Sequence, residues 1–138
     1  MIKLITDRTE SDVLLGTSKG QYSAEDLNRV EEAVSELQRL VGMIGLSMNL
    51  KTKTDWAPPG GFSVAEWPTK SQMNRYLENV RSICAELMTV GKDFPATMVG
   101  LDWRGANAIE RSLEQANERI QGVFNAYKYS GEFFAGEE

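Results

Sequence analysis

Hydrophobic residues recur every three or four positions in three stretches of the chain, a spacing that predicts three amphipathic helices. The first stripe, after Ser23, contains Leu27, Val30, Val34, Leu37, Val41, Ile44 and Met48. The second, after Pro68, contains Met73, Leu77, Val80, Cys84 and Leu87. The third contains Ile109, Leu113, Ala116, Ile120, Val123 and Tyr127. We therefore predict helices over residues 23–47, 69–90 and 105–128.

Capping signals support the predicted helix ends. Thr69 and Gln72 have the spacing of a capping box at the start of the second helix, and Ser23 with Asp26 resembles one at the start of the first. Gly91 is predicted to stop the second helix. Gly42 and Gly45, near the end of the first, allow two interpretations that the sequence leaves open: the helix ends early, or its backbone closely approaches another helix.

Amphipathic helices of this length cannot bury their apolar faces alone, so we expect them to pack on one another. The predicted fold class is all-α, a three-helix bundle forming a single domain over residues 1–138. The terminal arms, residues 1–22 and 129–138, are expected to be extended. No internal repeat is apparent in the sequence.

The connection between the first two helices is long for a compact domain, because it covers residues 49–67 and contains Pro58, Pro59, Gly60 and Gly61. Alternation over residues 50–56 and the aromatic composition of residues 129–134 are both typical of short strands. These two segments are therefore predicted to form a small β pairing.

Composition narrows the classes of partner. The net charge of −5 argues against a nucleic-acid partner, because phosphate binding requires a basic surface. The most apolar stretch, Leu40–Leu50, is far shorter than the ~20 residues that a membrane span requires. Met1–Arg8 is too short in its apolar part for a signal peptide. We expect a soluble protein, made in the cytoplasm, with no membrane partner.

The chain offers little for catalysis or cofactor binding. It has no histidine and one cysteine, which removes the commonest general base and excludes a thiolate zinc site. Cys84 lies on an apolar stripe and is predicted to be a core residue. Glu110, Glu114 and Glu118 follow one face of the third helix and indicate a solvated face, or one that meets a basic partner. We therefore predict no enzyme activity, metal site or cofactor.

A surplus of aromatic residues lies mostly outside the helical stripes. The candidate partner-binding residues are Trp56, Phe62, Trp67, Tyr129, Phe133 and Phe134. Aromatic side chains are favoured in protein interfaces, although such residues can also cover the ends of a helical bundle. We predict that the 129–134 segment and the 50–67 loop form one contiguous docking surface.

Several short phrases occur in order along the chain. They are Asp7-Arg8-Thr9, Asp12-Val13, Tyr22, Asp26-Leu27-Asn28-Arg29-Val30-Glu31, Lys53-Thr54-Asp55-Trp56, Pro68-Thr69, Met73, Arg75-Tyr76-Leu77, Asn79-Val80, Gly105-Ala106-Asn107-Ala108-Ile109-Glu110 and Tyr129-Ser130-Gly131-Glu132-Phe133-Phe134-Ala135-Gly136-Glu137. In these phrases the chain resembles a family of small proteins encoded in tail and baseplate regions of phages and prophages of Gram-positive bacteria. It departs from the family pattern in a shorter Val13–Tyr22 segment and in its last residue, Glu138.

The resemblance implies a non-catalytic structural role in the virion tail or baseplate. The implied partners are other tail or baseplate proteins, or further copies of this chain in a larger assembly, after synthesis in the host cytoplasm. A cytosolic tail-assembly chaperone or regulatory binding module is the alternative within binding proteins. A small-molecule enzyme that uses carboxylates of the long loop is the least favoured alternative, because no paired, motif-spaced acids are present.

Overall fold

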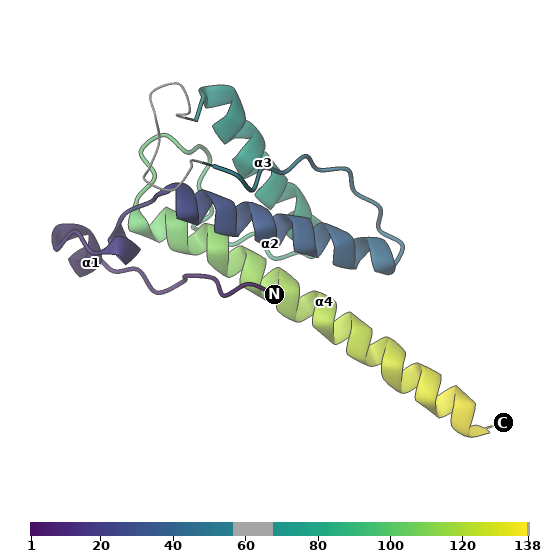
Figure 1. The fold of residues 1–138 in the computed structure, drawn as a ribbon. Helices are drawn as coiled ribbons and strands as arrows, with labels where there is room; N and C mark the ends of the chain where they lie inside the picture. Colours follow the sequence, from purple (N-terminus) through teal and green to yellow (C-terminus); the bar gives the residue numbers. More distant parts are fainter. Residues whose placement is uncertain (57–67, 138) are drawn as a thin grey trace.

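The computed structural model describes residues 1–56 and 68–137, with side chains described as far as Ala126. Within these residues the chain is mainly helical and contains no strand, so the predicted all-α fold class is confirmed. Along the chain, the elements are α1 (Glu10–Leu14), the 3₁₀-helix η1 (Ser18–Gly20), α2 (Ala24–Met43), α3 (Lys70–Glu86) and α4 (Trp103–Glu137) (Figure 1).

Both predicted capping boxes are present. Ser23 accepts the N–H of Asp26 and donates its own N–H to the Asp26 carboxylate at 2.6 Å. Thr69 and Gln72 make the same reciprocal pair at the start of α3. Each box pairs backbone N–H groups that have no partner within the helix. The sequence therefore predicted the starts of α2 and α3 to within a residue.

The end of α2 decides between the two interpretations of its glycines. The helix stops at Met43, and Gly45 adopts a positive φ of +90°. The N–H of Gly45 bonds the carbonyl of Gly42 at 3.2 Å, and the N–H of Leu46 bonds that of Val41 at 2.9 Å. This is a Schellman motif. A Cβ atom at Gly42 would meet nothing within 4 Å, so the helix ends early and no close backbone approach is involved.

Helix α3 stops at Glu86, earlier than the stop predicted at Gly91. The left-handed position that closes the helix is taken by Met88, with φ +57°. The N–H of Thr89 then bonds the carbonyl of Cys84 at 2.9 Å. Because this position usually favours glycine, the sequence signal pointed to the next glycine along the chain.

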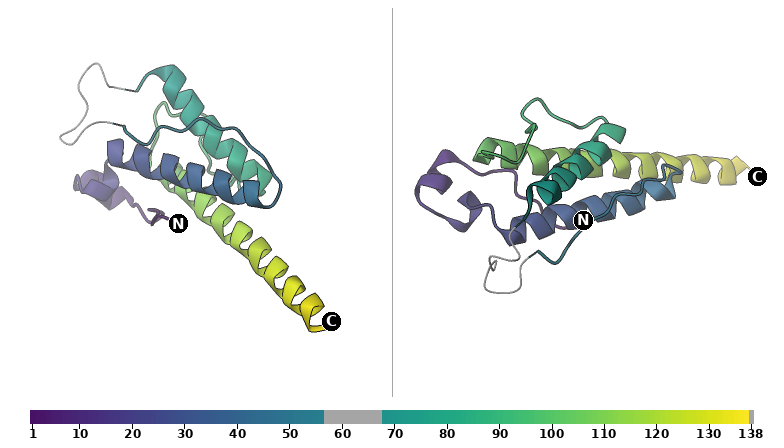
Figure 2. Two further views of the ribbon diagram at one scale, coloured as in Figure 1. Left: turned by 45° about the vertical axis from the view of Figure 1, so that its right-hand side comes forward. Right: turned by 90° about the horizontal axis from the view of Figure 1, so that it is seen from above.

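The hydrophobic core lies where α2, α3 and α4 pack against one another, each contacting the other two (Figure 2). It uses the three predicted stripes. The largest fully buried aliphatic residues are Val30, Val34, Leu37, Val41, Ile83, Ile109, Leu113 and Ile120. Cys84 is fully buried among them, as predicted.

The C-terminal segment differs from the prediction. Residues 129–134 are helical, because α4 continues to Glu137 instead of ending near 128 (Figure 1). The predicted β pairing with residues 50–56 is therefore not formed; the latter segment has no helix or strand assignment. A continuing helix pairs its backbone N–H and C=O groups with one another, whereas a strand pairs them only with a neighbouring strand. Aromatic composition alone did not distinguish these outcomes.

The N-terminal region is not a free extended arm. Residues 1–9 have no helix, but Leu4 and Arg8 are buried against the body. The short elements α1 and η1 follow and pack on each other. Gly20 makes this close approach possible, since a Cβ there would lie 2.3 Å from the backbone oxygen of Asp12. The sequence missed α1 because so short a helix carries no periodic stripe.

Candidate functional site

Trp56, one of the predicted partner-binding residues, is a core residue. Its side chain is 1% exposed, and its indole N–H donates to the carboxylate of Glu31 on α2. It lies over the first half of α2, and the far end of α4 projects from the opposite end of the molecule (Figures 1 and 2). Trp56 therefore does not share a surface with the 129–134 segment. Sequence reasoning missed this, because the buried acceptor comes from another element.

The structure describes only some of the other candidate partner-binding residues. Phe62 and Trp67 lie outside the described residues. Tyr129, Phe133 and Phe134 belong to the last part of α4, which projects past α2 and α3 (Figure 1). Their role in docking stays a prediction.

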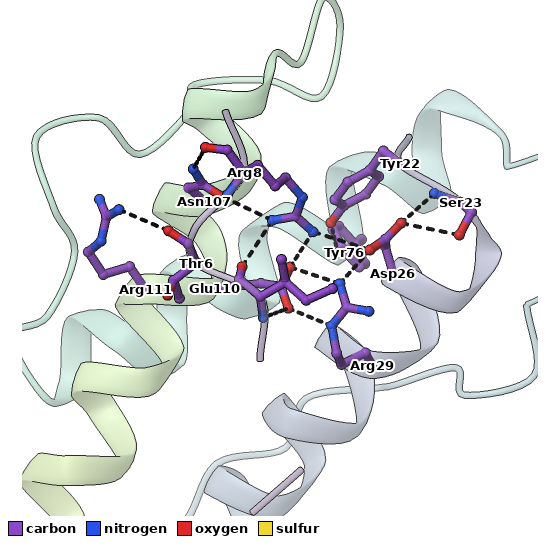
Figure 3. A network of polar contacts seen from close by, with 11 residues as sticks. Thr6, Arg8, Tyr22, Ser23, Asp26, Arg29, Tyr76, Asn107, Glu110 and Arg111 are labelled. Atoms are coloured by element: carbon purple, nitrogen blue, oxygen red, sulfur yellow. Dashed lines mark hydrogen bonds and ion pairs between the residues drawn. The ribbon is translucent and has the colours of Figure 1, made fainter. Parts of the chain in front are cut away.

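A buried ion-pair network joins three parts of the chain (Figure 3). Arg8 donates to Glu110 at 2.5 Å and to Asp26 at 3.1 Å. Arg29 donates to Glu110 at 2.6 and 2.9 Å and also bonds Asp26. The side chain of Glu110 is 0% exposed and that of Arg8 is 2% exposed. Two cations thus meet two carboxylates, which compensates charges that would be costly to bury singly.

The electrostatics of this network favour the ionised form of Arg29. Burial alone lowers the pKa of Arg29, but hydrogen bonds from its guanidinium to Glu110 and Asp26 outweigh burial and raise that pKa above its ordinary value. Nearby, the hydroxyl groups of Tyr22 and Tyr76 bond each other, and burial raises the pKa of both phenols. The tyrosines therefore stay neutral and close the network on the side of α3 (Figure 3).

The same network fixes the N-terminal backbone on α4. The Asn107 side chain accepts the N–H of Arg8 at 3.0 Å and donates to the carbonyl of Arg8 at 2.9 Å. Glu110 accepts the N–H of Ile5 at 3.1 Å. Arg111 donates to the carbonyl of Thr6 at 3.2 Å. We call Asn107 and Glu110, which hold residues 5–8, the N-terminal clamp.

A second arrangement, which we call the central clamp, holds residues 53–56 on α2 through Asn28 and Glu31. The Asn28 side chain accepts the N–H of Trp56 at 2.7 Å and donates to its carbonyl at 3.0 Å. Glu31 accepts the N–H of Lys53 at 3.1 Å. Its carboxylate also accepts two hydrogen bonds from the guanidinium of Arg75 on α3, at 2.6 and 3.0 Å. Glu31 is therefore satisfied although it is 2% exposed.

The two clamps are built alike. In each, asparagine and glutamate stand three positions apart on a helix. The asparagine bonds both backbone groups of one residue, and the glutamate bonds the N–H three positions earlier. The docked residues read Thr6-Asp7-Arg8 and Thr54-Asp55-Trp56, and the helices read Asn107-Ala108-Ile109-Glu110 and Asn28-Arg29-Val30-Glu31. The two clamps thus share a short pattern, Thr-Asp in the docked segment and Asn-x-x-Glu on the helix.

The predicted acidic face of the third helix is only partly correct. Glu114 and Glu118 are exposed, but Glu110 is fully buried within the network. Position on the helix could not separate them, because burial of Glu110 depends on Arg8 and Arg29 from other segments. The repeated Asn-x-x-Glu spacing was the signal that could have identified it.

Cys84 is the one nucleophilic thiol of the chain, and it is buried. Burial raises the pKa of the Cys84 thiol to about 12, which keeps it protonated and unreactive as a nucleophile at neutral pH. No group of three or more histidine, cysteine or acidic side chains suited to a metal ion occurs among the residues described. No described helix is long and apolar enough to cross a membrane. Comparisons with protein-family models, curated proteins and solved structures gave no match for this chain.

Proposed function

We propose that this protein is a non-catalytic structural component of a phage tail or baseplate that acts by protein–protein contact. The support from sequence is the ordered set of phrases that resembles tail-region proteins. The support from structure is the shape of α4. The proposed partners are other tail or baseplate proteins, and the proposed location is the virion after synthesis in the bacterial host.

The projecting end of α4 is the observation that carries this proposal. Helix α4 has 35 residues, and its C-terminal end extends beyond α2 and α3 (Figure 1; Figure 2, left). Helical segments without tertiary packing are marginally stable in water, because most helix stability in proteins comes from packing. The segment contains Tyr129, Phe133 and Phe134, residue types that favour interfaces. A partner that covers this helix end would add packing to it.

In this proposal, the rest of the molecule supports the projecting end of α4. We regard α2, α3 and the first part of α4 as a three-helix bundle that holds the projecting segment in a fixed direction. The buried ion pairs of Arg8, Arg29 and Glu110 tie the N-terminal region to this base. Rigid presentation lowers the entropy cost of docking a partner.

A double substitution tests the proposed docking element. Phe133→Ala with Phe134→Ala should reduce co-sedimentation with the purified particle at least tenfold and leave the melting temperature almost unchanged. The matched control is Gln115→Ala with Glu118→Ala, two exposed positions of α4 beside the body. Normal co-sedimentation of the double phenylalanine variant would reject the helix end as the docking element.

Mass spectrometry of purified particles separates a structural component from an assembly factor. A component of the tail is expected at a fixed copy number per particle. Detection in the lysate but not in particles would contradict the structural role and favour the chaperone alternative.

A further inference from the structure

The N-terminal clamp is a binding site for an extended peptide, and its requirements are specific. Asn107 requires a residue with free backbone N–H and carbonyl groups. Without Arg8, the buried Glu110 and Asp26 would share the single cation of Arg29. The site therefore requires a guanidinium three residues after the N–H that reaches Glu110. Among ligands of this chemistry, the segment Ile5-Thr6-Asp7-Arg8 of another copy fits as well as the chain's own.

The connection that follows the docked segment contributes nothing to the core. None of the described residues 9–21 is buried, and neither α1 nor η1 has a buried side chain. Leu14 and Leu15 are 78% and 79% exposed. Opening this connection exposes little additional apolar surface. About 13 residues at ~3.4 Å each span ~45 Å when extended, which is enough to reach a neighbouring molecule.

Few apolar contacts hold the docked segment on the body of the protein. Leu4 and Arg8 are the only residues among 1–9 that are buried, and Met1 and Ile2 are 46% and 43% exposed. Polar bonds to Asn107, Glu110, Asp26 and Arg111 provide further attachment, and a second copy offers the same bonds. Two forms of the protein can be compared: a monomer that docks its own segment, and a dimer in which each copy docks the segment of the other. They differ mainly in the conformation of residues 9–21 and in the free-energy cost of association.

We propose that two copies of this chain exchange their N-terminal segments, so that residues 1–8 of each dock on the N-terminal clamp of the other. Residues 9–21 are the connection that crosses between them. The dimer is reciprocal, because each copy both donates a segment and receives one. The inference stands apart from the proposed tail function, since it concerns this chain alone and needs no other protein.

The central clamp provides the matched control. Its segment is held at further points, since Leu50 N–H bonds Gln38 and the Lys51 carbonyl accepts from Arg75 and Asn79. These bonds add attachment points on α2 and α3, and the segment lies between these two helices along the chain, so we expect it to stay within its own chain. Equivalent positions of the two clamps can thus be compared directly.

A crosslinking experiment in mixtures of two full-length variants detects the exchange. One variant carries Thr6→Cys and the other Glu114→Cys; both positions line the same surface hollow. The proteins are mixed, warmed to just below the melting temperature, cooled and treated with a short bis-maleimide. Cys84 is buried and does not compete. The expected product is a crosslinked chain pair of twice 15.4 kDa, which requires the segment of one copy to lie on α4 of the other.

The control pair is Thr54→Cys and Ser35→Cys, the corresponding positions of the central clamp, which also share a hollow. It should crosslink only when both substitutions are in one chain. Heterodimer formation at least fivefold above this control supports exchange. Equal crosslinking between chains for the two pairs would show that the proposal is wrong. So would a Thr6→Cys and Glu114→Cys pair that crosslinks when both substitutions are in one chain but not when they are in different chains.

Gly20→Ala gives a second, independent measurement. An added Cβ would collide with the Asp12 backbone, so the substitution disfavours the closed packing of α1 on η1 without touching the clamp. Sedimentation velocity should show a dimer fraction at least twice that of the wild type at the same concentration. A wholly monomeric Gly20→Ala protein with a native helical spectrum would overturn the proposal.

Discussion

Arg8 and Glu110 form a buried ion pair at 2.5 Å although they lie 102 positions apart in the sequence. Each also has a second oppositely charged partner, Asp26 for Arg8 and Arg29 for Glu110. The pair therefore joins the N-terminal segment, α2 and α4 at one point. Its energetic importance lies less in the attraction itself than in what its loss would leave unpaired.

Replacement of Glu110 tests this network. Glu110→Gln should lower the free energy of unfolding by about 3–5 kcal/mol, because Arg8 and Arg29 would be left buried with Asp26 alone. Urea unfolding measures the change. The control is Glu114→Gln, one turn along the same helix and exposed, which should alter stability by less than about 0.5 kcal/mol. Equal effects at the two positions would contradict the network.

Trp56 distinguishes a core residue from a docking residue. Trp56→Ala should destabilise the fold by about 3–5 kcal/mol, since it removes a large, fully buried side chain. Trp56→Phe should cost less, because an aromatic ring remains and only the N–H bond to Glu31 and part of the packing are lost. Thermal unfolding gives both values. An unchanged melting temperature for Trp56→Ala would show that the residue is not part of the core.

Met88 is the one non-glycine residue with positive φ in the described chain, and it is 78% exposed. Met88→Gly should stabilise the protein by about 0.5–1 kcal/mol, because glycine adopts the left-handed conformation without the steric cost of a Cβ. Met88→Ala retains the Cβ and should bring little or no gain. A chemical denaturation series measures all three proteins, and a stabilised alanine variant would refute this explanation.

Cys84 predicts a dependence of stability on alkaline pH. The ordinary pKa of the thiol is 9.0, and burial raises it in the folded protein to about 12. Between these values the unfolded state binds fewer protons than the folded state. The free energy of unfolding therefore falls as the pH rises, by up to about 1.4 kcal/mol per pH unit for this group.

Cys84→Ala isolates that contribution. The variant loses packing at every pH but has no thiol to ionise, so the stability advantage of the wild type should shrink between pH 8 and pH 11. Tyr22 and Tyr76 are present in both proteins and their effects cancel in the difference. A constant difference across this range would mean that the thiol does not retain its proton in the folded state.

Local sequence patterns predicted much of the fold. Stripes such as Val30, Val34 and Leu37 identified the buried faces, and the Thr69–Gln72 capping box identified where α3 begins. The burial of Cys84 followed from its place on a stripe. These features depend on residues within one or two helical turns of each other, so that periodicity and capping preferences are sufficient to infer them.

The site was decided by contacts between distant segments. Glu110 and Glu114 are the same residue type one turn apart, yet only Glu110 meets Arg8 and Arg29 and is buried. Trp56 is buried because Asn28 and Glu31 hold its backbone and indole. A charged or amphipathic side chain is stable inside only where oppositely charged or hydrogen-bonding partners converge. Those partners are far apart along the chain, and only the tertiary structure brings them together.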